Sequence, residues 1–189
     1  MGPGNHLVLR SPEAFSLTSI RGPGWDGGSR NTDNSRQKTD TTLRYDPVVV
    51  QPMRDELSRL GFVQLMTPEE VDAVMTRRNG TALVVVNSVC GCAAGMARPG
   101  VALALEKSAM RPDVLVTVFA GMELDAVERA RGYFEPYPPS SPQIALFKDG
   151  ALVHMIERKD IEGRVPGEIA DDLALAFVEH CSRGRERPS

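Results

Sequence analysis

The sequence predicts an α/β fold in which helices cover both faces of a central mixed β-sheet, so that the domain has three layers. From Asp46 onward, apolar runs alternate with turn signals in the order helix, then β-α-β-α-β-α-β-β-α. The early βα units indicate parallel strands, because a strand followed by a helix returns to the sheet in the same direction. The turn residues 148–150 separate the last two strands, which are therefore expected to form an antiparallel hairpin.

The helices are predicted from amphipathic spacing and from their end signals. Met53, Leu57 and Leu60 recur at three- and four-residue spacing ahead of Gly61, a residue type that commonly ends a helix. Thr67-Pro68 combines a favourable N-cap residue with a proline at the first helical position. The expected helices cover residues 47–60, 68–78, 92–110, 123–134 and 165–181.

Five strands are expected, and one of them is buried on both faces. TALVVVNS is a continuous run rich in β-branched residues, which is typical of a central strand between two helix layers. In the helix that follows, Pro99 removes a backbone donor and is expected to kink the helix, while Gly95 and Gly100 are expected at close-packed positions. The expected strands cover residues 61–65, 81–88, 114–120, 143–147 and 151–156.

Composition divides the chain of 189 residues into one domain and two flanking segments. Residues 1–44 hold six of the 17 glycines and the only tryptophan in polar stretches without periodicity, so we expect a disordered N-terminal extension. Residues 45–182 are expected to form the domain, and residues 183–189 a polar C-terminal tail.

Charge and hydropathy argue against several functional classes. The formal net charge is -3 and no run of basic residues is present, so nucleic-acid binding is not expected. No stretch of about 18 apolar residues and no secretory signal pattern occurs, so we expect no membrane partner and a cytoplasmic location. With only three cysteines, the chain is not a disulfide-stapled secreted scaffold.

Two of the three cysteines stand one residue apart, in Cys90-Gly91-Cys92. The triplet lies where the buried strand ends and a helix begins, which is the edge at which open α/β sheets place ligands. The free N–H groups and positive dipole end of a helix N-terminus stabilise a thiolate and lower the pKa of a cysteine there. A disulfide between residues two apart is strained and easily exchanged, and glycine tolerates the backbone it requires. The triplet therefore predicts thiol–disulfide exchange.

Other interpretations of the cysteines remain open. Two inert cysteines could fill space near the sheet. Alternatively, Cys90, Cys92 and the C-terminal His180-Cys181 supply four soft ligands, which would make the chain a metal-binding module. A third hypothesis is an interaction protein whose N-terminal extension docks a partner.

Ser141-Pro142 directly precedes the strand expected at residues 143–147. A proline at such a junction is a candidate for a cis peptide bond. Pro136, Pro138 and Pro139 crowd the same loop, so a stiff loop in trans is the alternative.

Several segments stand in a recognisable order: VNSVCGCAAGMARPG, TVFAG, PPSSPQIALFKDG and HMIERKDIEG, with a cysteine near the C-terminus. In kind and order they resemble the bacilliredoxin family of bacterial thioredoxin-like proteins, over about residues 44–182. The resemblance implies a thioredoxin fold and thiol–disulfide exchange or isomerase activity. In the best-known lineage it further implies removal of bacillithiol from mixed disulfides on cytosolic proteins.

The resemblance also implies roles for individual residues. Cys90 matches the nucleophile of the family and Cys92 the second cysteine of its CGC segment. Ser141-Pro142 matches the cis-proline loop beside the active site, where a client backbone binds. Cys181 matches a C-terminal cysteine and is a candidate resolving thiol. The stretch 158–160, Arg-Lys-Asp, departs from a histidine-containing version, so no nearby imidazole is expected to assist catalysis.

The expected chemistry requires no metal, nucleotide or flavin, and the chain contains neither a P-loop nor a GxGxxG segment that follows an expected strand and opens a helix. A low-molecular-weight thiol such as bacillithiol is the expected co-substrate. The expected partners are thiolated client proteins, this small thiol and a reductase that recycles the enzyme.

Overall fold

The continuous β-branched run forms strand β2 (Thr81–Asn87), and all seven of its residues are buried. The computed structural model describes residues 44–181. Successive side chains of β2 point to opposite faces of the sheet, with Leu83 and Val85 in one hydrophobic core and Val84 and Val86 in another. The prediction of a central strand covered on both faces is confirmed.

Strand β2 lies at the centre of a five-stranded sheet with the order β1-β3-β2-β4-β5. Strands β1 (Val63–Gln64) and β2 both pair in parallel with β3 (Val114–Phe119). Strand β4 (Gln143–Lys148) runs antiparallel to β2, and β5 (Ala151–Ile156) runs antiparallel to β4. The predicted combination of parallel strands with a C-terminal hairpin is therefore present.

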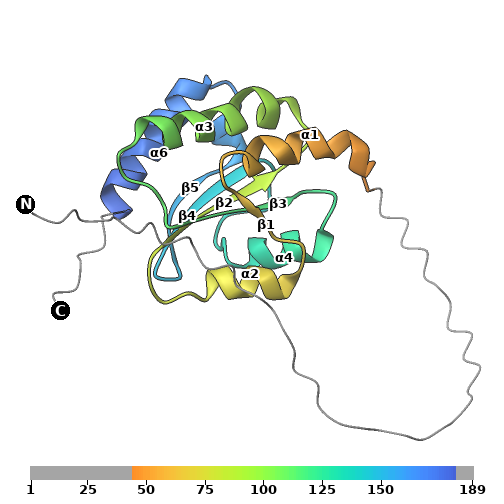
Figure 1. The fold of residues 1–189 in the computed structure, drawn as a ribbon, viewed down its shortest axis with the longest axis horizontal. Helices are drawn as coiled ribbons and strands as arrows, with labels where there is room; N and C mark the ends of the chain where they lie inside the picture. Colours follow the sequence, from red (N-terminus) through yellow and green to blue (C-terminus); the bar gives the residue numbers. More distant parts are fainter. Residues whose placement is uncertain (1–43, 182–189) are drawn as a thin grey trace, which may run out of the picture. The chain divides into compact units, whose positions relative to one another are not determined.

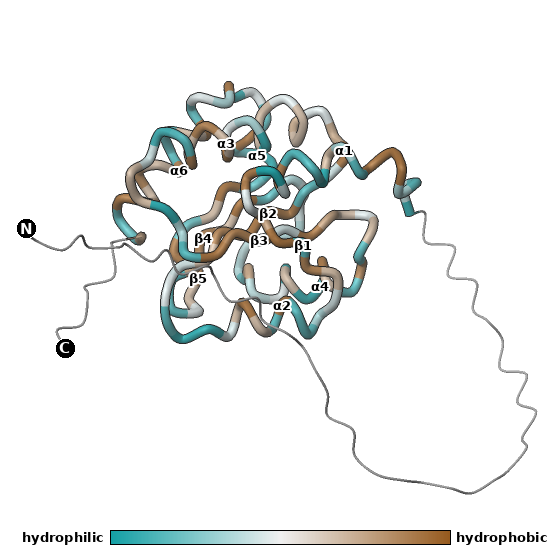
Figure 2. Tube along the Cα trace, in the orientation of Figure 1, coloured by the Kyte–Doolittle hydropathy of each residue, from teal (hydrophilic) through white to brown (hydrophobic). Residues whose placement is uncertain are grey.

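Helices cover both faces of this sheet, as Figure 1 shows. Helices α1, α3 and α6 lie on one face, and α2 and α4 lie on the other. Figure 2 shows the apolar segments gathered in the strands between the two helix layers, which is the three-layer, thioredoxin-like arrangement. The bounds of these helices are Pro47–Ser58 for α1, Pro68–Met75 for α2, Arg98–Lys107 for α3, Leu124–Gly132 for α4 and Pro166–His180 for α6.

Two local features differ from the sequence predictions. The helix expected at residues 92–110 ends at Lys107 and is not a regular α-helix throughout. A π-helical segment, Ala93–Ala97, precedes α3, so Pro99 lies in the first turn of α3, where its missing N–H breaks no bond of that helix. The short helix α5 (Arg158–Ile161) was not predicted, because four residues are too few to show a helical period.

The predicted N-terminal extension and C-terminal tail lie outside the described residues, except for Arg44. Within residues 44–181, no helix is long and apolar enough to cross a membrane.

Helix α3 packs tightly against α6 at Gly100. A Cβ atom on Gly100 would lie 2.7 Å from Ile169 Cγ2 and 3.2 Å from the Pro166 carbonyl oxygen, so glycine is required by the packing. A Cβ atom on Gly95 would meet no atom within 4 Å. The prediction of a close-packed glycine is confirmed for Gly100 and wrong for Gly95.

The substitution Gly100→Ala is expected to lower the free energy of unfolding by about 1–3 kcal/mol, because α6 must shift to admit the added methyl group. Gly95→Ala is the matched control and is expected to change this free energy by less than about 1 kcal/mol. Urea denaturation of both variants measures the difference. Equal stability of Gly100→Ala and the unsubstituted chain would contradict the packing argument.

Candidate active site

Three chain segments meet at the edge of the sheet where β2 ends. Cys90 follows the end of β2 by three residues and precedes the π-helical segment by three. Strand β4 begins at Gln143 opposite Val86, so the preceding Ser141-Pro142 lies beside the cysteines. Strand β5 runs parallel to β2 and also ends at this edge, where Arg158 follows it.

The two cysteines of the triplet have their sulfur atoms next to each other. The distance from Cys90 Sγ to Cys92 Sγ is 2.7 Å, and both residues are free thiols. Cys90 is half-buried and Cys92 is buried, with 8% of its surface exposed. The pair is therefore close enough to form a disulfide after a small movement, and an attacking molecule reaches Cys90 more easily than Cys92.

Polar groups surround the Cys90 sulfur. The Ser88 hydroxyl oxygen lies 3.1 Å from it, and the backbone N–H of Ala93 donates a hydrogen bond to it over 3.4 Å. The Ser141 carbonyl oxygen lies 4.0 Å away. Because a thiolate has no proton to donate, the Ser88 hydroxyl, the Cys92 thiol and the Ala93 N–H can all act as donors to the ionised form of Cys90.

These surroundings separate the pKa values of the two thiols. Partial burial raises the pKa of Cys90, but the hydrogen bonds from Cys92, Ser88 and Ala93 and the positive charge of Arg158 outweigh it, so the net shift is downward. Burial raises the pKa of Cys92, and the hydrogen bond to Cys90 and the negative charge of the Cys90 thiolate raise it further. The site thus holds one thiol that ionises readily and one that keeps its proton.

The Ser141-Pro142 peptide bond is cis, as its position at the loop-to-strand junction indicated. The Glu135-Pro136 bond is also cis, which the sequence analysis did not predict. The loop is held from outside by Arg131, whose guanidinium donates to the Ser140 carbonyl oxygen over 2.9 Å. The sequence-predicted loop and cysteines are therefore brought together.

Two residues at this site were missed by the sequence analysis, Ser88 and Arg158. Arg158 donates to Glu162 over 2.7 Å and lies 3.5 Å from the Ser141 carbonyl oxygen, and both Arg158 and Ser88 line a pocket of about 230 Å³ at Cys90. The strand order predicts the position of Arg158, because β5 runs parallel to β2 and must end at the same edge of the sheet, two residues before Arg158. No comparable signal marks Ser88 apart from its place between the strand and the triplet.

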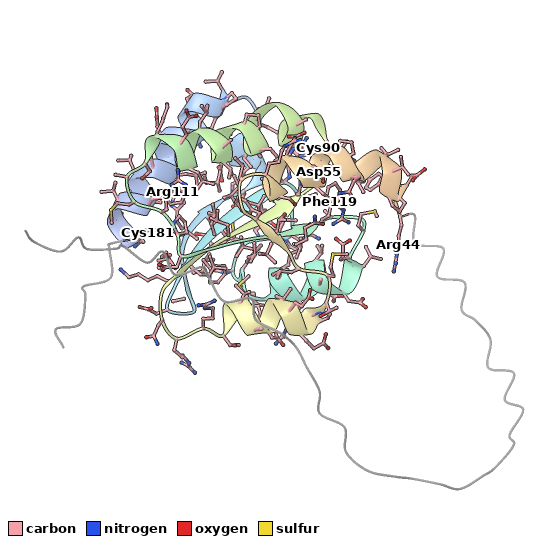
Figure 3. All side chains as sticks on the ribbon, viewed as in Figure 1. Arg44, Asp55, Cys90, Arg111, Phe119 and Cys181 are labelled. Carbon is pink, nitrogen blue, oxygen red and sulfur yellow. The ribbon has the colours of Figure 1, made fainter. Side chains whose placement is uncertain are left out.

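Cys181 does not belong to this site. Its thiol lies within hydrogen-bonding reach of Thr81, the first residue of β2, and its pKa is raised by burial. Cys90 follows the opposite end of β2, a strand that spans about 20 Å. Figure 3 shows Cys90 and Cys181 far apart in the domain. The expectation that Cys181 resolves a disulfide on Cys90 within one molecule is therefore corrected.

The metal-site interpretation fails for the same reason. His180 and Cys181 stand at the end of α6, away from Cys90 and Cys92, because β5 ends at the active-site edge and the 15 residues of α6 lead back from it. Among residues 44–181, no group of three or more histidine, cysteine, aspartate or glutamate side chains is placed to hold a metal ion. The proposed four-ligand set is not assembled.

Comparison with known proteins agrees with the site. The model of a family described as "Disulphide isomerase" matches residues 45–181. A protein named bacilliredoxin from Halalkalibacterium halodurans is 54% identical over 137 residues, which cover 72% of this chain and 94% of the relative. A bacilliredoxin from Salinibacter ruber is 52% identical over 147 residues, covering 77% of this chain and 85% of the relative. The chain belongs to the bacilliredoxin family.

Solved structures related to this bacilliredoxin-family chain have low sequence identity. A putative oxidoreductase with a thioredoxin fold is 18% identical with a TM-score of 0.47, over 65% of this chain and 96% of that one. Mitochondrial thioredoxin 3 from Saccharomyces cerevisiae is 17% identical with a TM-score of 0.44, over 65% and 98%. Family membership and the paired cysteines identify the chain as a thiol–disulfide oxidoreductase.

Iodoacetamide is expected to alkylate Cys90 before Cys92, because only the thiolate attacks and the pKa of Cys90 is lowered while that of Cys92 is raised. As pH rises, the rate at Cys90 is expected to increase through its lowered pKa and then level off. Peptide mass spectrometry across a pH series measures each cysteine separately. Cys181 is the internal reference and is expected to react slowly, because it is buried. Faster labelling of Cys92 than of Cys90 would reverse the assignment.

Proposed function

We propose that this protein removes a low-molecular-weight thiol, such as bacillithiol, from mixed disulfides on client proteins. The observation that carries the proposal is the asymmetry of the cysteine pair. Cys90 is half-buried with a lowered pKa, and Cys92 is buried beside it with a raised pKa. The name shared by the curated relatives supports bacillithiol as the small thiol. We further propose a cytoplasmic location, where a reductase can recycle the enzyme.

In the first step, the Cys90 thiolate attacks the sulfur of the small thiol within the mixed disulfide. A bond forms between Cys90 Sγ and that sulfur, and the bond to the client cysteine breaks. The client sulfur leaves with the electron pair of the broken bond and takes up a proton from solvent. The client is thereby reduced, and Cys90 carries the small thiol as a mixed disulfide.

In the second step, Cys92 loses its proton and attacks Cys90 Sγ, which lies 2.7 Å from its own sulfur in the free enzyme. The small thiol leaves with the electron pair, and a Cys90–Cys92 disulfide forms. Alternatively, a second molecule of the small thiol attacks the adduct, which frees Cys90 and forms the symmetrical disulfide of the small thiol. A thiol or a reductase then returns the enzyme to the dithiol form.

The client chain binds across the Ser141-Pro142 loop, by strand-like pairing with its backbone. Two features support this placement. The Ser141 carbonyl oxygen faces Cys90 Sγ at 4.0 Å. A groove of about 880 Å³ between α4 and the proline-rich loop shares Gly121 with the pocket at Cys90, which leaves room for a polypeptide next to the disulfide.

Isomerisation of a client's own disulfides would begin with the same attack by Cys90. The family description "Disulphide isomerase" supports this second use of the site. The two reactions differ in what leaves, because isomerisation keeps both sulfurs of the attacked bond on the client. An assay distinguishes the two reactions by its substrate, which is either a client carrying a small thiol or a client with disulfides of its own.

Single-cysteine variants test the proposal. Cys90→Ser is expected to abolish release of the small thiol from a thiolated client, because the attacking sulfur is gone. Cys92→Ser is expected to keep the attack and to accumulate a mixed disulfide on Cys90, because the neighbouring resolving thiol is absent. Intact-protein mass spectrometry after exposure to a bacillithiolated client measures both outcomes.

Cys181→Ser is the matched control, since Cys181 lies at the opposite end of β2. It is expected to release the small thiol at the unsubstituted rate. An adduct trapped on Cys92 in Cys90→Ser, with Cys92→Ser inert, would reverse the roles of the two thiols. Rapid loss of any adduct from Cys92→Ser through Cys181 would reinstate Cys181 as a resolving thiol.

A further inference from the structure

A buried guanidinium lies behind the nucleophile. Arg98, the first residue of α3, has only 4% of its surface exposed. Its Nε donates to Glu56 Oε2 over 2.6 Å, and one terminal nitrogen lies 3.4 Å from Glu56 Oε1. The other terminal nitrogen donates to Asn87 Oδ1 over 3.1 Å and to the Ser88 carbonyl oxygen over 3.2 Å. Arg98 thus joins α1, the end of β2 and the residue that contacts Cys90.

These contacts hold Ser88 from two sides. Its N–H donates to Asn87 Oδ1 over 2.9 Å, and its carbonyl oxygen accepts from Arg98. Asn87 is itself held by its amide, which donates to the Met53 carbonyl oxygen over 3.1 Å. Ser88 is 5% exposed, and the partner of its hydroxyl among the described residues is Cys90 Sγ at 3.1 Å. The backbone clamp therefore determines where the hydroxyl lies relative to the sulfur.

Stability alone is a weak reason for this arrangement. Burying the Arg98 guanidinium costs desolvation free energy, and the Glu56 carboxylate is 40% exposed, where an ion pair contributes little to stability. Arg98 also does not supply the charge that acts on Cys90, which comes from Arg158. What Arg98 does provide is a planar fork of donors that binds Glu56, Asn87 and Ser88 in one fixed geometry.

We propose that Ser88 is a catalytic residue that donates a hydrogen bond to the Cys90 thiolate, and that Arg98, anchored by Glu56 and Asn87, is the positioning residue that holds Ser88 in place. The inference rests on the proposed function only in taking Cys90 as the nucleophile. No bond other than the hydrogen bond changes in this step. The hydroxyl donates while Cys90 is a thiolate.

The test is the rate at which iodoacetamide alkylates Cys90 across a pH series, with thermal denaturation as the check on folding. Ser88→Ala is expected to slow alkylation at pH 7 roughly three- to tenfold and to displace the pH profile upward, because the thiolate loses a donor. Arg98→Lys keeps the positive charge but loses the planar set of guanidinium donors. It is expected to shift the pH profile of Cys90 alkylation upward, as Ser88→Ala does. The double variant is expected to be no slower than Ser88→Ala alone, because Arg98 acts through Ser88.

Arg54→Lys is the matched control. Arg54 is 8% exposed and pairs with Glu123 on the same side of the domain, but no hydrogen bond links it to Ser88 or Cys90. It is expected to lower the melting temperature without moving the pH profile. An unchanged profile in Arg98→Lys, or additive slowing in the double variant, would overturn the proposal.

If Arg98→Lys does not fold, Glu56→Gln takes its place, since the Glu56 side chain is 40% exposed and the substitution keeps its shape. Glu56→Gln is expected to slow alkylation of Cys90 less than Arg98→Lys would. Combined with Ser88→Ala, it is expected to cause no slowing beyond that of Ser88→Ala alone. A double variant that is slower than Ser88→Ala would overturn the proposal. Because alkylation needs no client, a protein that fails to release small thiols yet shows these shifts would count against the proposed function and not against the Ser88–Arg98 relation.

Discussion

Strand β2 is hydrogen-bonded along both edges, parallel to β3 and antiparallel to β4, and is buried over its whole length. A strand bound in this way cannot slip, because a shift of one residue would exchange the two faces of the sheet. Its end at Asn87 is therefore a fixed point, and the site is built outward from it. The register of β4 on β2 places Ser141-Pro142 beside Cys90, and the direction of β5 delivers Arg158 to the same edge. The chemistry depends on these pairings more than on any single contact near the sulfur.

The elements with strong local signals were predictable from the sequence. A continuous β-branched run predicts β2, and the turn residues Asp149-Gly150 predict the hairpin. In the structure both turn residues have positive φ. The π-helical segment Ala93–Ala97 was not predictable, because no residue pattern distinguishes it from an ordinary first helical turn. A strand was expected at residues 61–65, but β1 covers only Val63–Gln64, because so short a strand shows too little alternation to define its ends.

At the site, the residues adjacent in sequence were predicted and the residues brought in by folding were not. Cys90 and Cys92 are visible in one short motif, whereas Ser88 becomes informative only when its hydroxyl is seen against a sulfur. The error over Cys181 has a topological cause. Strand β5 ends at the active-site edge, so the 15 residues of α6, about 22 Å of helix, carry the chain back to the far end of the sheet. This topology excludes contact between Cys181 and Cys90.

The close pair of thiols also gives the proposed exchange an order. Two thiolates 2.7 Å apart would repel strongly, so ionisation of one cysteine disfavours ionisation of the other, and the surroundings decide that Cys90 ionises first. Burial raises the pKa of Cys92 most, but the hydrogen bond to Cys90 and the charge on Cys90 also contribute. Once Cys90 is bonded to a small thiol it carries no charge, so the contribution from its charge disappears and the hydrogen bond no longer ends on a thiolate. Burial then remains as the main factor that raises the pKa of Cys92, and the positive charge of Arg158 still lowers it. The first reaction therefore makes the second thiol easier to ionise, and Cys92 is released to attack when there is an adduct for it to resolve.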